Sequence, residues 1–178
     1  MKLEGSETEK NLYKTFAGES RARNKYTFYA EKAICEGYRW VAEVFETTAK
    51  QEMAHAREAF GRYLGKNGST EENLEEAIGG ELEENKKIYK EFEDVAREEG
   101  FKEIADFYKE LREVEESHAE NFEVLLNRIK EDKMFKDSKS NMWQCMNCGY
   151  IHEGEEAPSF CPLCKYPRIY FKEYCKIE

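Results

Sequence analysis

Two copies of a Glu-x-x-His motif lie on stretches whose apolar residues recur at helical spacing, and further acids fall in the same phase on two other such stretches. The positions are Glu52/His55, Glu115/His118, the acidic pair Glu81/Glu84 and the single Glu19. Charges directed into a helix bundle are unfavourable unless something neutralises them. Paired metal ions are the usual neutraliser in bundles of this design. The pattern therefore predicts helices arranged around a metal centre.

The apolar spacing predicts four long helices. The first begins at a capping box, Ser6-x-x-Glu9, and runs to about residue 36. The others cover about 38–64, 80–99 and 101–132, with a short helix at 74–78 that ends before Gly79-Gly80. Very short turns join the first helix to the second and the third to the fourth, so each pair is expected to be an antiparallel hairpin. Two such hairpins make a four-helix bundle with a weak internal repeat.

The predicted ligands of the bundle are five glutamates and two histidines: Glu19, Glu52, His55, Glu81, Glu84, Glu115 and His118. Residues three apart on a helix share one face and differ by about 4.5 Å in height, so such a pair can hold one ion or bridge two. Glutamate is abundant in this chain, and a solvated acidic face is the alternative interpretation. These residues occupy positions on the apolar stripe of all four predicted helices, which favours a metal site over a solvated face. Carboxylates with imidazole suit iron or manganese, with zinc as a further option.

A second metal site is predicted after residue 140, from the pairs Cys145-x-x-Cys148 and Cys161-x-x-Cys164. Each pair forms a knuckle with two thiolates, and two knuckles enclose one tetrahedral ion. The spacing leaves zinc and iron open. The predicted domains are a bundle at 1–135, a polar linker at 136–142 and a metal-bound module of strands and loops at 143–178, which is too short to fold on its own core.

Composition narrows the environment and the partners. The net charge of −10 argues against nucleic acid, and no apolar run approaches the length that a bilayer requires. The amino-terminal residues lack the apolar region of a signal peptide. Cysteines in C-x-x-C pairs without an export signal favour a reducing cytoplasm. Cys35 is expected to be a buried small hydrophobe, His152 to be structural or exposed, and Cys175 has no assigned role.

The chain resembles the rubrerythrin family over nearly its whole length. The resemblance is carried by Glu19-Ser-Arg-Ala-Arg-Asn-Lys-Tyr26, Glu52-Met-Ala-His55, Gly80-Glu81-Leu-Glu-Glu84, Glu115-Glu-Ser-His118, Trp143-Gln-Cys145-Met-Asn-Cys148-Gly-Tyr150 and Cys161-Pro-Leu-Cys164. It implies a ferritin-like bundle with a non-haem di-iron site, followed by a rubredoxin-like domain with one iron in the tetrathiolate. In the family, Glu84 corresponds to an extra carboxylate that one iron exchanges for the histidine at position 55 on reduction. Tyr26 and Tyr89 match tyrosines kept beside the site.

The resemblance further implies an oxidoreductase that reduces hydrogen peroxide to water in oxidative stress defence. Its electrons would come from NAD(P)H through a reductase or a rubredoxin-like carrier, pass through the tetrathiolate iron, and reach the bundle in a head-to-tail homodimer. Two alternatives stay open at this point. One is a ferroxidase or iron-handling protein that uses oxygen, and the other is a non-catalytic protein with zinc in the tail. One departure from the pattern is Lys165, where free rubredoxins usually have glycine after the second knuckle.

Overall fold

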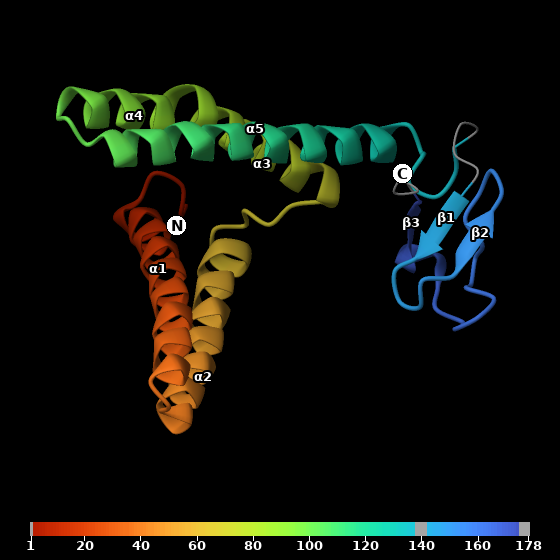
Figure 1. Ribbon diagram of the computed structural model, residues 1–178, viewed down its shortest axis with the longest axis horizontal. Helices are drawn as coiled ribbons and strands as arrows, with labels where there is room; N and C mark the ends of the chain where they lie inside the picture. The colour runs from red at the N-terminus through yellow and green to blue at the C-terminus, as the bar shows by residue number, and fades with distance from the viewer. Residues whose placement is uncertain (1, 138–141, 175–178) are drawn as a thin grey trace. The chain divides into compact units, whose positions relative to one another are not determined.

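The computed structural model of the chain describes residues 2–137 and 142–174 (Figure 1). The chain separates into two compact units, one ending at Ser69 and the other beginning at Thr70. Within the described residues, no helix is both long enough and apolar enough to cross a bilayer.

The first unit is a helical hairpin of α1 (Glu7–Cys35) and α2 (Arg39–Arg57), and α2 continues into the π-helix η1 (Glu58–Tyr63). The predicted cap is confirmed, because Glu9 N donates to Ser6 Oγ at 3.1 Å. The hairpin turns at Gly37, whose φ of +84° lies in the left-handed region that favours glycine. The two helices meet along small residues that are all buried, namely Ala30, Ala33, Ala42, Ala49, Ala56 and Ala59.

The second unit begins with a helical hairpin in which one long helical segment packs against α5 (Lys102–Lys130). The segment is formed by α3 (Thr70–Glu83), the π-helix η2 (Glu84–Ile88) and α4 (Tyr89–Glu98) without a break. The prediction of a short helix that ends before Gly79-Gly80 is therefore wrong, since both glycines lie inside α3. An interior glycine costs a helix only about 1 kcal/mol relative to alanine. Packing against α5 is sufficient to carry the helix through them.

The predicted internal repeat is confirmed by two aromatic clusters with the same geometry. In the first hairpin, the ring centroids of Tyr26 and Tyr29 lie 6.0 and 5.5 Å from that of Phe45. In the second hairpin, Tyr89 and Phe92 lie 6.0 and 5.5 Å from Tyr108. The corresponding positions are 63 residues apart in each case, as in Phe45 and Tyr108.

One extra residue breaks the repeat at the π-helix η2. Glu19 and Tyr26 are seven residues apart, whereas Glu81 and Tyr89 are eight apart, and η2 lies between the latter two. A π-helix absorbs a one-residue insertion by widening one turn, which changes the pairing of its backbone carbonyls. Here Asn85 O accepts a bond from Arg112 Nε at 2.7 Å, and Asn85 Nδ2 donates to Arg112 O at 2.8 Å. The insertion is thus tied directly to α5.

An ion-pair network continues from Arg112 along the second hairpin. The Arg112 guanidinium donates to the buried Glu93 carboxylate at 2.9 Å, and Arg97 donates to the same carboxylate at 3.0 Å. Burial raises the pKa of Glu93, but the hydrogen bonds from the two arginines outweigh it and hold the pKa below its usual value. The corresponding residues of the first hairpin are Ala30 and Ala49, so the network is specific to the second half of the repeat.

The carboxyl-terminal part of the second unit is a small antiparallel sheet of β1 (Met142–Cys145), β2 (Ile151–Glu153) and β3 (Phe171–Glu173), in the order β2-β1-β3. A short 3-10 helix, η3 (Arg168–Tyr170), leads into β3. The core of this module contains Trp143, Cys145, Ala157, Cys161 and Phe171. Phe135 packs against that core, and Ala157 N donates to Phe135 O at 2.8 Å. The module therefore includes contacts from before the predicted linker, of which residues 138–141 lie outside the described residues.

Candidate metal centres

The first hairpin brings Glu19, Glu52 and His55 together. His55 Nδ1 lies 2.9 Å from Glu52 Oε2 and 3.5 Å from Glu19 Oε2. The two carboxylates are half-buried and the imidazole is exposed. The contact spans both helices, because Glu19 comes from α1 and the other two from α2. Three donor atoms that lie within 4.8 Å of one another form a group of the kind that holds a metal ion.

The second hairpin repeats this triad with Glu81, Glu115 and His118. His118 Nδ1 lies 2.9 Å from Glu115 Oε2 and 3.6 Å from Glu81 Oε2. Glu81 comes from α3 and the other two from α5, so the elements also correspond. In both triads Nδ1 is the ring nitrogen that faces the carboxylates. Two groups of the same composition and nearly the same distances indicate two equivalent metal positions, one on each hairpin.

The titration of these groups reflects how closely the carboxylates approach one another. A hydrogen bond with Glu52 raises the pKa of Glu19, and the same bond together with one to His55 lowers the pKa of Glu52. Burial raises the pKa of Glu81, and a hydrogen bond with Glu115 adds to the effect. Carboxylates this close repel one another when both are ionised. Each triad therefore favours taking up protons or a cation.

Glu84, the seventh predicted ligand, belongs to neither triad among the described residues. It is the first residue of η2, and its carboxylate makes a hydrogen bond with the Tyr89 hydroxyl. Burial, and next this bond, raise the pKa of Tyr89 to about 12, so the phenol stays protonated at neutral pH. Tyr26, the other tyrosine that the resemblance places near the site, lies in the aromatic cluster with Phe45.

The four predicted cysteines converge in the carboxyl-terminal module. Cys145 Sγ lies 3.7 Å from Cys164 Sγ, and Cys148 Sγ lies 3.6 Å from Cys161 Sγ. A tetrahedron of sulfurs about 2.3 Å from a central ion has edges of about 3.8 Å. The four sulfur atoms thus have the separations that a tetrathiolate metal site requires.

Two backbone knuckles of the same form present these sulfurs. In the first, Cys145 N donates to Tyr150 O and Gly149 N donates to Cys145 O, both at 2.8 Å. In the second, Cys161 N donates to Tyr166 O at 2.8 Å and Lys165 N donates to Cys161 O at 2.9 Å. Gly149 and Lys165 have φ values of +77° and +63°. The departure at Lys165 therefore leaves the shape of the loop intact, at the cost of placing a side chain in the left-handed region.

The electrostatics of the four thiols also favour a cation. Burial opposes ionisation of Cys164, but hydrogen bonds from the Asn147 side chain and the Tyr166 backbone outweigh it and lower the pKa of that thiol to about 6. A backbone bond from Tyr150 favours the Cys148 thiolate, yet burial and the neighbouring thiols raise the pKa of Cys148 to about 12. Four thiolates form together only when a metal ion compensates their charge.

The remaining predicted residues lie apart from these groups. Cys35 is exposed at the end of α1, so the prediction of a buried hydrophobe is wrong; the turn at Gly37 leaves this last residue of the helix open to solvent. His152 lies in β2, where its side chain is partly buried against Gly154. Cys175 lies outside the described residues. The sequence interpretation did not predict the contacts among Asn85, Glu93 and Arg112. The only sequence signal for them was the extra residue between Glu81 and Tyr89 relative to the first half of the repeat.

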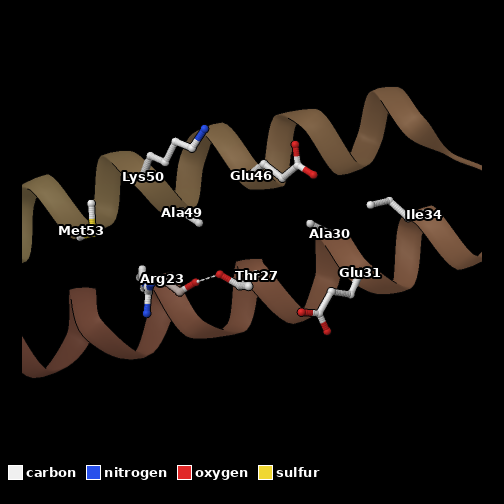
Figure 2. Close-up of a pocket in the computed structure, with 9 residues that line it drawn as sticks. All are labelled: Arg23, Thr27, Ala30, Glu31, Ile34, Glu46, Ala49, Lys50 and Met53. Carbon is white, nitrogen blue, oxygen red and sulfur yellow. Dashed lines mark hydrogen bonds between the residues drawn. The ribbon is translucent and has the colours of Figure 1, made fainter. Parts of the chain in front are cut away.

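A groove with a volume of about 370 Å³ lies between α1 and α2, apart from the first triad (Figure 2). It opens over Ala30 and Ala49, and Arg23 O accepts a bond from Thr27 Oγ1 at its edge. The corresponding positions of the second hairpin carry the Glu93–Arg112 ion pair. The groove thus exists because Ala30 and Ala49 are too small to fill the space that Glu93 and Arg112 fill in the second hairpin.

Comparison with known proteins agrees with this geometry. A rubrerythrin family model matches residues 10–126 and 72–143, and a model of the rubrerythrin rubredoxin-like domain matches residues 143–172. The chain belongs to the rubrerythrin family. It is 42% identical to a rubrerythrin of Porphyromonas gingivalis over 96% of this chain and 91% of that one. It is 37% identical to a rubrerythrin of Nitratidesulfovibrio vulgaris over 96% of this chain and 95% of that one.

Membership of the rubrerythrin family fixes the class of protein and of cofactor. The fold is a ferritin-like helical domain with a rubredoxin-like carboxyl-terminal module, and the family consists of iron-binding oxidoreductases. The donors fit that chemistry, since the carboxylate–imidazole triads suit the two irons of the helical domain and the four cysteines suit the single iron of the module.

Proposed function

We propose that this protein is a peroxide reductase that converts hydrogen peroxide to water and is re-reduced through its rubredoxin-like module. The observation that carries the proposal is the pairing of two matched carboxylate–imidazole triads with one tetrathiolate site on a single chain. Peroxide takes up two electrons and two protons when its O–O bond breaks and two waters form. Two ferrous ions would supply one electron each, and the tetrathiolate iron would replace those electrons one at a time.

The proposed ligands of the two irons are the six triad residues together with Glu84. The Glu84 carboxylate makes a hydrogen bond with the Tyr89 hydroxyl, and this hydroxyl remains protonated at neutral pH. A neutral phenol there can orient the carboxylate and serve as a proton donor to oxygen atoms reduced nearby. We propose Tyr26 as the corresponding aromatic residue of the first hairpin. The ligands of the single iron would be Cys145, Cys148, Cys161 and Cys164.

Several finer features belong to the same proposal. The domain boundaries would be 1–135 for the bundle and 143–178 for the module, joined by the linker at 136–142. The electrons would originate from NAD(P)H and arrive through a reductase or a redox carrier. The protein would act in the cytoplasm, as the free thiols among the described residues suit a reducing compartment. The module of one copy would serve the bundle of another in a homodimer.

The electron relay is tested with Cys161→Ser. This change removes one thiolate from the tetrathiolate site, so catalytic turnover with an external donor should fall at least 100-fold. The pre-reduced bundle should still consume one equivalent of peroxide in a stopped-flow experiment, because its own ligands are unchanged. Cys35→Ser is the matched control and should turn over normally. Full multiple turnover by Cys161→Ser would exclude the relay.

The bundle site is tested with Glu115→Ala, which removes the most buried member of the triads. Elemental analysis should show loss of bundle iron while the red tetrathiolate centre remains. Glu116→Ala changes the neighbouring exposed glutamate and should retain all iron.

A comparison of the wild-type turnover rate with peroxide and the rate with oxygen separates a peroxide reductase from a ferroxidase. Faster turnover with oxygen would support the ferroxidase.

A further inference from the structure

The carboxyl-terminal end of α5 is joined to the rubredoxin-like module by the side chain of one arginine. Arg128 Nη1 donates to Glu173 Oε2 of β3 at 2.6 Å, and Arg128 Nη2 donates to Lys133 O at 2.9 Å. The Arg128 side chain is 19% exposed, so most of it is shielded from water. A planar guanidinium that makes two such bonds at once is held in one direction. Arg128 thus connects the helix, the turn that follows it and the last strand of the module.

The backbone leaves α5 through a turn that has its own hydrogen bonds. Asp132 has a φ of +55°, and Lys133 N donates to Arg128 O at 2.7 Å. Asp132 N donates to Ile129 O at 3.0 Å. These two bonds around a residue in the left-handed region form the Schellman motif that commonly ends a helix. The direction in which the chain leaves α5 is therefore defined by the backbone itself.

The segment after this turn is part of the module. Ala157 N donates to Phe135 O at 2.8 Å, and Lys136 forms an antiparallel bridge with Glu156. The Phe135 side chain packs against the buried core of the module, to which Ala157 also belongs. The chain therefore enters the module five residues after α5 ends at Lys130.

These contacts differ from those of a module that is joined to a helix by a polar linker alone. Such a linker lets a small domain take many orientations. Here the turn after α5, the packing of Phe135 and the bond from Arg128 to Glu173 act at separate points. A rotation of the module on the helix would have to break the last two contacts together. Of these, the bond from Arg128 is the one that reaches β3, at the far end of the module sequence.

We infer that Arg128 is a positioning residue, which fixes the rubredoxin-like module on α5 so that the tetrathiolate site keeps one place relative to the second hairpin. The inference rests on the proposed function and deepens it. The transfer that this arrangement serves moves one electron from a ferrous tetrathiolate iron to a ferric iron of the bundle, and no bond or proton is exchanged. Its rate falls steeply with the distance between the two centres. A module that samples many orientations would spend little time in those that allow transfer.

α5 is the helix on which a fixed module has the most direct effect. It carries Glu115 and His118 of the second triad, and Arg128 lies ten residues after His118, or about 15 Å along the helix axis. The contact of Arg128 with Glu173 therefore relates the tetrathiolate site to a helix of the bundle site. In the proposed homodimer it would also determine which part of the second copy the module can reach.

Time-resolved fluorescence anisotropy of Trp143 measures the motion of the module without any redox chemistry. Trp143 is fully buried and its indole N–H donates to Gly154 O, so the ring moves with the module. The experiment uses the zinc-loaded full chain with Trp40→Phe, which leaves Trp143 as the only tryptophan. In this protein the anisotropy should decay with the single slow time of the whole molecule.

Two variants remove the two partners of the contact separately. Arg128→Gln and Glu173→Ala should each add a faster component to the anisotropy decay, while an unchanged emission maximum of Trp143 shows that the module is still folded. Arg62→Gln is the matched control, since it breaks an exposed arginine–glutamate pair that lies within η1. This control should leave the decay unchanged.

A second measurement separates positioning from stability. When peroxide is added to the fully reduced protein, the red colour of the oxidised tetrathiolate iron should appear at least tenfold more slowly in Arg128→Gln than in wild type. The reduction potential of the tetrathiolate site should be the same, because its four cysteines are unchanged. The bundle should still consume one equivalent of peroxide. A residue that only stabilised the fold would not slow electron transfer in the folded protein.

The outcomes separate this inference from the proposed function. A fast component in the wild-type decay would overturn the inference, whether or not the protein reduces peroxide. Normal electron transfer by an Arg128→Gln variant whose module moves would overturn the positioning role as well. A wild type whose tetrathiolate iron is not oxidised by peroxide would count against the proposed function, and the anisotropy would still decide whether the module is fixed.

Discussion

At the scale of single residues, the chain accepts an unfavourable backbone conformation at Lys165, where the backbone of the knuckle determines how the cysteines are presented. Lys165 adopts a φ of +63° because its knuckle must close in the same way as the one at Gly149. Its ammonium group donates to Pro162 O at 2.9 Å, which returns part of the lost stability. The sequence allowed this position to be recognised as unusual, because the first knuckle has glycine in the same place. The sequence did not show whether the knuckle would change its backbone conformation or whether the lysine would adopt a positive φ.

Replacement of Lys165 by glycine should stabilise the rubredoxin-like module by about 1 kcal/mol, because glycine adopts a positive φ without the clash of a Cβ atom. Thermal unfolding of the zinc-loaded protein, followed by tryptophan fluorescence, measures the change. Lys172→Gly is the control, since Lys172 has ordinary strand geometry and should lose stability on the same substitution. A lower midpoint for Lys165→Gly would show that the bond to Pro162 outweighs the backbone strain.

Glu93 should make the second hairpin sensitive to acid. Its pKa is lower in the folded than in the unfolded chain, so its stabilising contribution is fully present above the unfolded pKa and is lost as the pH falls through the folded one. The difference in unfolding free energy between wild type and Glu93→Gln should therefore be constant from pH 7 to about pH 5 and shrink below about pH 4. Urea titrations followed by circular dichroism measure it. Glu91→Gln, on an exposed position of the same helix, should lack that profile.

At the scale of helices, apolar periodicity predicted most elements and missed the features that distinguish the two hairpins. The Glu-x-x-His motifs could be found because polar residues that can bind a metal stand out on an apolar stripe. The break before Gly79-Gly80 was wrong because tertiary packing overrides glycine's weak helix propensity. The π-helix η2 escaped prediction because a single inserted residue hardly alters the spacing around it. Its presence becomes clear only when Glu81 and Tyr89 are aligned with Glu19 and Tyr26.

Arg112 should be the residue on which η2 depends most. Arg112→Lys keeps the charge but cannot make the bonds to Asn85 O and Glu93 together, so a backbone carbonyl loses its partner beside a buried carboxylate. We expect a loss of about 1–3 kcal/mol in unfolding free energy. Denaturant unfolding at pH 7 measures this loss, and Arg57→Lys, an exposed arginine of α2, is the control. A change below about 0.5 kcal/mol would mean that η2 forms independently of Arg112.

At the scale of the whole molecule, the sequence identified the parts and could not predict their assembly. The apolar stripes mark a face on each hairpin, yet the pattern alone does not say which chain covers it. The helix seams are built from alanines, and larger side chains such as Val44 and Phe107 remain exposed. Small residues let two helices approach closely, while the bulkier ones need a further surface.

The rubredoxin-like module should depend on its metal for folding. Trp143 is fully buried there and its indole N–H donates to Gly154 O at 3.0 Å, whereas Trp40 on α2 is 81% exposed. Removal of zinc from the zinc-loaded protein with a chelator should expose Trp143 and shift its emission to longer wavelength, because the core of the module is too small to persist alone. The Trp40→Phe variant isolates that signal. An unchanged spectrum after complete removal of zinc would show a module that folds without metal.

The single added residue in η2 has a consequence for what two duplicated halves can achieve. Two identical hairpins can offer only two identical binding positions. Once both halves lie in one gene, either can change while the other stays as it was. The insertion at η2, whose first residue is Glu84, has no counterpart between Glu19 and Tyr26. The two proposed metal positions would therefore differ in the carboxylates available to each, and two unlike ions can divide a reaction in a way that a symmetric pair cannot.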